Sequence, residues 1–121
     1  MPPDDFFDFS LQDRRFRVAA TDANGVVSGQ TILTFAHGPG GVSARYSGGP
    51  IVEGHLLGAL DGPASLHFCY VQIDRDRRVD AGRSTATIDR LPDGRLRLTE
   101  RFAWFTRPGE GVNIFEEVPP E

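Results

Sequence analysis

A glutamate stands in the middle of an otherwise apolar face near the end of the chain. In the run LRLTERFAW, every second residue is leucine, phenylalanine or tryptophan, except for Glu100. Burial disfavours the charged form of a carboxyl group, so such a group must be paired or neutral. Two interpretations follow. Glu100 is a structural carboxylate paired with Arg83 or Arg101, or it is a general acid or base with a raised pKa.

The hairpin that precedes Glu100 decides which residues face it. If residues 93–94 form a two-residue turn, Arg83 lies opposite Trp104 and points to the same side of the sheet. The inward residues of that strand are then Arg83, Thr85 and Thr87. One bulge reverses the two faces of a strand, and the inward residues are then Ser84 and Ala86. The sequence leaves both registers open.

A second hairpin, at Asp61-Gly62, supplies the other side of the expected pocket. A two-residue turn there places His55 opposite Phe68, on the more apolar face of residues 64–73. His55 is therefore expected to point inward. The three histidines do not converge, so we expect no metal site, and no cofactor motif is present.

These patterns give a list of candidate site residues. The catalytic candidates are Glu100 and Tyr70. The ligand-binding candidates are Tyr46, His55, Phe68, Gln72, Arg83, Phe102 and Trp104. Aromatic rings with a few polar groups are typical of a pocket for a small apolar or aromatic molecule.

The elements that position these residues are short extended runs separated by turn residues. We expect eight strands, at 16–21, 26–36, 42–46, 51–60, 64–73, 79–91, 95–106 and 112–118. The connections are too short for parallel crossovers, so neighbouring strands are antiparallel. The predicted fold class is all-β. It is a single up-and-down meander closed into a small calycin-like barrel, with a half-open sheet or sandwich as the alternative.

Composition limits the setting of this domain. Residues 1–15 are expected to form a partly disordered arm, with Phe6, Phe7 and Phe9 closing one end of a single domain at 16–121. The net charge of −4 disfavours nucleic-acid binding. No apolar run is long enough to span a membrane, and no secretory signal is visible. Because the chain has one cysteine, a cytoplasmic location is expected. The sequence does not decide whether the protein forms a homodimer.

Several motifs resemble those of a known family. YSGGPIVEGHLLG, LHFCYVQID and LPDGRLRLTERFAW occur in the order and spacing found in small bacterial proteins that are commonly labelled n-acetylglutamate synthase. Phe102 replaces a tryptophan of that pattern, and Ser84 replaces a cysteine, which should reshape any pocket. An acetyltransferase of that kind needs a pyrophosphate loop that opens a helix. The only candidate, 38–41, lies between two predicted strands.

Three functions remain open on this reasoning. The first is a small-molecule-binding barrel with an interior glutamate. The second is a small barrel enzyme, such as a cyclase, isomerase or lyase of a biosynthetic pathway, with Glu100 as general acid or base. Tyr70 or Arg83 would then stabilise a developing oxyanion. The third is an interaction module without catalysis, which adds an outer strand or its arm to a partner's sheet.

Overall fold

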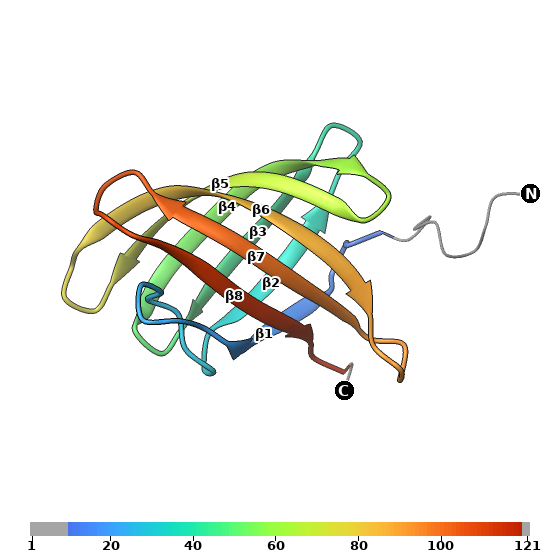
Figure 1. Cartoon of the computed structure of the whole chain (residues 1–121), viewed down its shortest axis with the longest axis horizontal. Helices are drawn as coiled ribbons and strands as arrows, with labels where there is room; N and C mark the ends of the chain where they lie inside the picture. Colours follow the sequence, from blue (N-terminus) through green and yellow to red (C-terminus); the bar gives the residue numbers. More distant parts are fainter. Residues whose placement is uncertain (1–9, 120–121) are drawn as a thin grey trace, which may run out of the picture.

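Eight β-strands make up most of the described chain. The computed structural model describes residues 10–119, and Figure 1 shows the strands in sequence order. They are β1 Arg15–Ala20, β2 Ile32–His37, β3 Val42–Gly48, β4 Ile51–Gly62, β5 Ser65–Asp74, β6 Val79–Arg90, β7 Leu96–Trp104 and β8 Glu110–Glu117. Between residues 10 and 119 there is no helix with the length and apolar character to cross a membrane.

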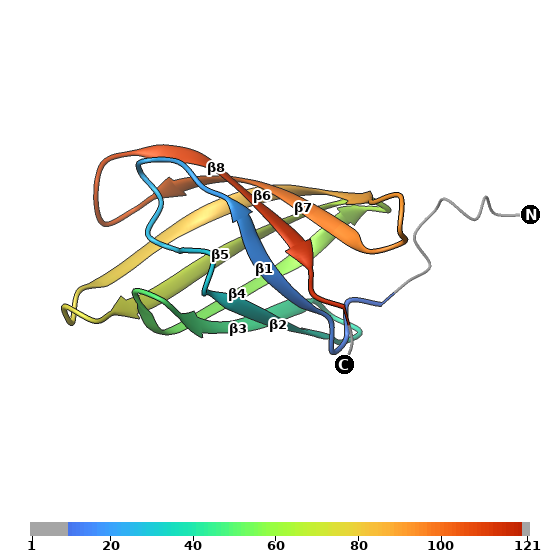
Figure 2. The same cartoon turned by 90° about the horizontal axis from the view of Figure 1, so that it is seen from below.

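The strands close into an antiparallel barrel. Each strand pairs with the next along the chain, and β1 also pairs with β8, with Phe16 opposite Glu117. Figure 2 shows this seam, where β1 in blue lies beside β8 in red. The predicted all-β meander closed into a barrel is confirmed. Closure leaves no open sheet edge among the described strands.

The second strand is shorter than the sequence predicted. It begins at Ile32, and residues 26–31 form a loop that runs along one end of the barrel, as Figure 2 shows. Thr31 explains the difference, because its hydroxyl accepts from the Ser28 N–H at 3.1 Å and donates to the Gly48 carbonyl at 2.9 Å. These bonds fold the segment 21–31, which we call the β1–β2 loop, over the barrel end instead of into the sheet.

Apolar side chains fill the opposite end of the barrel. The almost fully buried residues at that end are Leu11, Phe16, Val42, Leu66, Ile88 and Leu96. The rings of Phe16 and Phe35 pack edge to face with centroids 5.3 Å apart. Leu11 belongs to the predicted arm, and its N–H donates to Nδ1 of His37 at 3.0 Å. The arm's Phe6, Phe7 and Phe9 lie outside the described residues.

The register of β6 against β7 follows the bulged alternative. Ser84 lies opposite Phe102, one residue away from the two-residue-turn prediction. The loop has three residues, 92–94, because Gly94 takes a φ of +93° and the Leu91 N–H donates to the Arg95 carbonyl at 2.7 Å. The extra residue reverses the strand faces. The inward residues are therefore Ser84 and Ala86, and the prediction for Arg83, Thr85 and Thr87 is wrong.

The predicted inward position of His55 is also wrong. The turn between β4 and β5 lies at 63–64 rather than 61–62, and β4 contains bulges near both of its ends. His55 consequently lies opposite Val71, with its ring on the outer wall of the barrel. Its Nε2 is 2.7 Å from Oε2 of Glu53, which is also exposed. The histidine is an outer-wall residue and has no part in the interior.

Candidate functional site

The barrel contains a cavity at the end covered by the β1–β2 loop. Its volume is about 40 Å³, which is room for a few water molecules. Seven of the nine candidate site residues line it: Tyr46, Phe68, Tyr70, Gln72, Glu100, Phe102 and Trp104. The other two, His55 and Arg83, point outward. The structure therefore brings most of the predicted site residues together. The two predicted residues that it leaves out are the basic ones, so no basic side chain lines the cavity.

Glu100 points into this cavity from β7, and only 5% of its surface is exposed. Its Oε2 is 2.5 Å from the Ser84 hydroxyl, and its Oε1 accepts from Nδ2 of Asn113 at 2.9 Å. The Thr21 hydroxyl donates in turn to Oδ1 of Asn113 at 2.5 Å. Burial raises the pKa of the Glu100 carboxyl, and the hydrogen bonds from Ser84 and Asn113 oppose the rise only in part. Both hydrogen-bond partners of the carboxyl are neutral.

The two tyrosines of the cavity differ in their hydrogen bonding. The Tyr46 hydroxyl donates to Oε1 of Gln72 at 2.9 Å. The Tyr70 hydroxyl is buried and has no hydrogen-bond partner among the described residues. Burial, with the charge of Glu100 as the second cause, raises the pKa of both phenols, so both stay protonated at neutral pH. Tyr70 thus contributes to the cavity wall a phenol whose buried hydroxyl lacks a partner among residues 10–119.

Glycines opposite these tyrosines make room for their rings. Gly54 pairs with Tyr46, and Gly82 pairs with Tyr70. A Cβ atom on Gly54 would lie 2.3 Å from Cε2 of Tyr46, and one on Gly82 would lie 2.3 Å from the Tyr70 hydroxyl oxygen. Each ring therefore lies across the bare backbone of its neighbour. These two glycines are needed for close approach rather than for turns.

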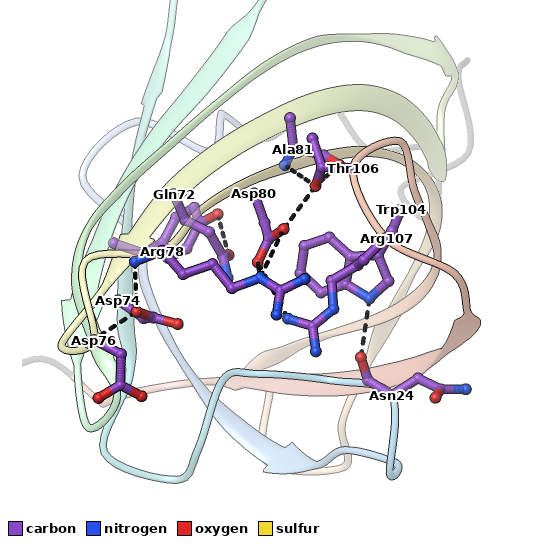
Figure 3. A network of polar contacts seen from close by, with 11 residues as sticks. Asn24, Gln72, Asp74, Asp76, Arg78, Asp80, Ala81, Trp104, Thr106 and Arg107 are labelled. Carbon is purple, nitrogen blue, oxygen red and sulfur yellow. Dashed lines mark hydrogen bonds and ion pairs between the residues drawn. The ribbon is translucent and has the colours of Figure 1, made fainter.

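A polar network surrounds the mouth of the cavity, which we define as the barrel end under the β1–β2 loop (Figure 3). The Asp80 carboxylate accepts from the Thr106 hydroxyl at 2.7 Å and from Arg107 at 3.1 Å, and it lies 3.1 Å from Nε of Arg78. Burial alone would raise the pKa of Asp80. The hydrogen bonds from Thr106 and Arg107, with the charges of Arg78 and Arg107, outweigh burial and hold that pKa below its usual range.

The same network fixes Trp104 as a wall of the cavity. The Arg107 guanidinium lies over the Trp104 ring, 5.4 Å from its centroid, and Nε1 of Trp104 donates to the Asn24 carbonyl at 3.0 Å, as Figure 3 shows. Asn24 belongs to the β1–β2 loop, and its Nδ2 donates to the Glu110 carbonyl at 2.9 Å. The loop is thereby held to β7 and β8.

Some residues of the site were missed from the sequence. Asn113 shares a strand face with Phe115, and this alternation is the signal that could have identified it. Val26 and Val27 were assigned to a strand, yet they line the cavity from the β1–β2 loop. Between residues 10 and 119, no three His, Cys, Asp or Glu side chains cluster closely enough to hold a metal ion.

Fold and site together define a class of protein, a closed eight-stranded antiparallel barrel with an aromatic-lined interior cavity. The chain belongs to the avidin-like protein family, whose model matches residues 9–118. This is a family of small-molecule-binding β-barrels. The match gives no support to the n-acetylglutamate synthase label. No curated protein and no solved structure matches the chain.

Proposed function

We propose that the protein binds a compact, largely apolar molecule in the cavity beneath the β1–β2 loop. The observation that carries this proposal is the Tyr70 hydroxyl, which is buried without a partner among residues 10–119. Leaving a buried polar group unpaired costs about 1–3 kcal/mol, and a ligand atom bonded to it would remove that cost. The surrounding wall is mainly aromatic and aliphatic, so the body of the ligand is apolar.

The size of the cavity restricts the ligand. A volume of about 40 Å³ is far below the roughly 300–1,000 Å³ of sites that hold drug-sized molecules. Val26 and Val27 are half-buried, pack against the core and line the cavity on the side of the β1–β2 loop. A ligand of only a few non-hydrogen atoms fits beneath them, whereas a larger ligand, benzamide included, requires the β1–β2 loop or the lining side chains to move. Biotin, the ligand associated with the avidin-like family, belongs to the larger group.

Trp104 provides a direct test, because it lines the cavity and is the single tryptophan of the chain. We expect benzamide, a compact aromatic molecule with a carbonyl for Tyr70, to change Trp104 fluorescence saturably. Tyr70→Phe should weaken benzamide binding roughly 5- to 10-fold, the value of one neutral hydrogen bond. Absence of a saturable response to both benzamide and biotin would contradict the proposal.

An enzymatic role is the second candidate, and one observation favours it. Burial raises the pKa of Glu100, and its hydrogen-bond partners are neutral, so the carboxyl is held toward the protonated form that a general acid uses. The test is to incubate the protein with a compound that it binds and to look by mass spectrometry for a product of that compound. Turnover that survives Glu100→Gln without loss would exclude this carboxyl as the acid.

The outer wall favours a homodimer as the partner arrangement. Leu57, Val52 and Val71 are exposed on the outer face of β4 and β5. Burying such a face between two copies removes apolar area from water. Analytical ultracentrifugation should then show a dimer that Leu57→Glu dissociates, and a monomer at high concentration would refute it. Strand addition to a partner's sheet has no site among the described strands, because β1 and β8 pair.

A further inference from the structure

We infer that the head group of the ligand is a small organic cation, a guanidinium or ammonium group, held by Glu100 inside a box of aromatic rings. This inference rests on the proposed function, since it names the class of molecule that the same cavity takes. It goes further, because an apolar molecule alone would leave the interior carboxyl with neutral partners only.

Charge in the cavity is distributed in a way that suits a cation. The aromatic residues that line it are Tyr46, Phe68, Tyr70, Phe102, Trp104 and Phe115. The negative faces of such rings attract ammonium and guanidinium groups. The lining contains one acidic side chain, Glu100, and no lysine, arginine or histidine. Arg107 lies over Trp104 at the mouth, but its guanidinium is already bonded to Asp80.

The Glu100 carboxylate keeps the capacity to accept further hydrogen bonds. Ser84 and Asn113 each bond to one of its oxygens, whereas a carboxylate offers about four acceptor positions. The Tyr70 hydroxyl oxygen is also free to accept within the described structure. The carboxyl group, the phenol of Tyr70 and the aromatic rings that a cation would use therefore line the same cavity. The cation would also provide the positive charge that a buried carboxylate needs as a partner.

The pH dependence of binding separates a cation from a neutral ligand. Burial raises the pKa of Glu100, and a bound cation favours the deprotonated form, so its affinity should rise with pH through that pKa. The other titratable groups that face the cavity are Tyr46 on β3 and Tyr70 on β5, which stay protonated at neutral pH. Asp80 on β6 acts on Tyr70 but lies in its own ion pairs. The residues that face Glu100 from β4, β6 and β8, such as Leu56, Ser84 and Asn113, are neutral.

The experiment compares methylguanidinium with methylurea, which share shape and number of heavy atoms and differ in charge. A guanidinium keeps its charge over the whole working range, so any pH dependence below the tyrosine range reports the protein. By Trp104 fluorescence and calorimetry, methylguanidinium should bind at least about 10-fold more tightly than methylurea at pH near 8, the value of one charge-assisted hydrogen bond. This preference should shrink as the pH falls through the Glu100 pKa.

Two variants assign the preference to Glu100. Glu100→Gln keeps the size of the side chain, removes its charge and replaces one acceptor oxygen with an NH2 donor. Methylurea can both donate and accept, so it should still bind, and methylguanidinium should then bind about as tightly as methylurea. Glu53→Gln makes the same chemical change on the outer wall, where the Glu53 side chain is 62% exposed, and should leave the preference unchanged.

Other results would overturn the inference. Equal or tighter binding of methylurea by the unaltered protein would refute a cationic head group. So would a preference for methylguanidinium that persists in Glu100→Gln. If benzamide binds but methylguanidinium does not, the inference fails and the proposed function stands. If benzamide, biotin, methylurea and methylguanidinium all fail to bind, both fail together.

Discussion

The two tyrosines that line the cavity differ in the hydrogen bonding of their hydroxyl groups. Tyr46 is bonded to Gln72 at 2.9 Å, and Tyr70 has no described partner. Tyr46→Phe should therefore lower the free energy of unfolding by about 1 kcal/mol or more, because Gln72 loses a buried partner. Tyr70→Phe should leave it unchanged or raise it. Urea denaturation of the two variants checks this contrast, and equal losses in both would contradict it.

Glu100 should make the stability of the protein depend on pH in a particular direction. Its pKa is raised in the folded state by burial. The stability linked to this group is therefore complete below the unfolded pKa and declines as the pH rises through the folded pKa. Glu100→Gln should remove this decline, so the variant should gain stability relative to the parent at alkaline pH.

The measurement is the free energy of unfolding of both proteins between about pH 4 and about pH 9. Their difference should grow with pH, because other titrating groups are common to both. Glu53→Gln is the matched control on the outer wall, where the pKa of Glu53 is lowered by its hydrogen bond to His55. A constant difference between parent and Glu100→Gln would contradict the expected titration.

At the scale of the strands, the sequence predicts where the turns lie but not the register in which neighbouring strands pair. The eight strands follow from the spacing of glycine, proline and aspartate between short apolar runs. The 91–95 turn shows where this reasoning fails, because Gly94 adds one residue and moves Arg83 to the outside. Propensity locates a turn to within a residue or two, but a shift of one residue reverses a whole strand. Bulges in β4 had the same effect on His55.

The site could be predicted largely through β5 and β7. Their apolar alternation is strong enough to settle which face is inward, so Tyr70, Gln72 and Glu100 were found. The alternation in β8 indicates that Asn113 faces inward, but its position opposite Glu100 follows only from the pairing of β8 with β7. Val26 and Val27 were missed because the side chain of Thr31 turns their segment out of the sheet. Non-local contacts of this kind leave little trace in local sequence.

Asp80 joins strand β6 to the loop after β7, and this connection should matter most at neutral pH. Its side chain is 3% exposed and its pKa is held below the usual range. Asp80→Asn should lower the free energy of unfolding by roughly 1–3 kcal/mol at pH near 7, because bonds to Thr106 and Arg107 lose their charge assistance. The contribution of a group with a lowered pKa is lost as the pH falls through that pKa, so the difference should vanish in strong acid.

Chemical denaturation at several pH values measures this effect. Asp76→Asn removes the same charge from the neighbouring turn, where Asp76 is exposed, and serves as the control. A loss that persists unchanged in strong acid, or an equal loss in the control, would show that the ion pairs are not its source.

The packing of a tyrosine over a glycine on the next strand gives another prediction for the sheet. A Cβ atom at Gly54 would meet the Tyr46 ring at 2.3 Å, so Gly54→Ala must displace that ring. We expect a loss of about 1–3 kcal/mol in unfolding free energy, typical of overpacking, and a changed Trp104 emission. Gly62→Ala on the same strand meets no atom within 4 Å and should be close to neutral. Similar losses in the two variants would refute the packing argument.

The molecule as a whole divides into a solid end and a hollow end. One end of the barrel is filled by Leu11 and the side chains around it, and the other holds the cavity under the β1–β2 loop. The loop is fixed by hydrogen bonds from Trp104 and Val112 to Asn24 and Asp22. Access to the cavity therefore depends on the stability of this loop and of the strands on either side of it.

The pairing of β1 with β2 should be the first part of the barrel to open. These strands are in register over three residue pairs, Arg15 to Arg17, whereas β4 to β7 pair along nine or more. A short ladder has fewer hydrogen bonds to break, so its amides reach solvent through a less costly local opening. In hydrogen exchange followed by mass spectrometry, segments within 15–37 should exchange well before segments within 51–104.

A saturating cavity ligand should slow the exchange of residues 15–37 more than that of residues 51–104, because the β1–β2 loop covers the cavity. Uniform protection around the barrel, or protection by ligand confined to β4–β7, would mean that the cavity is reached by another route.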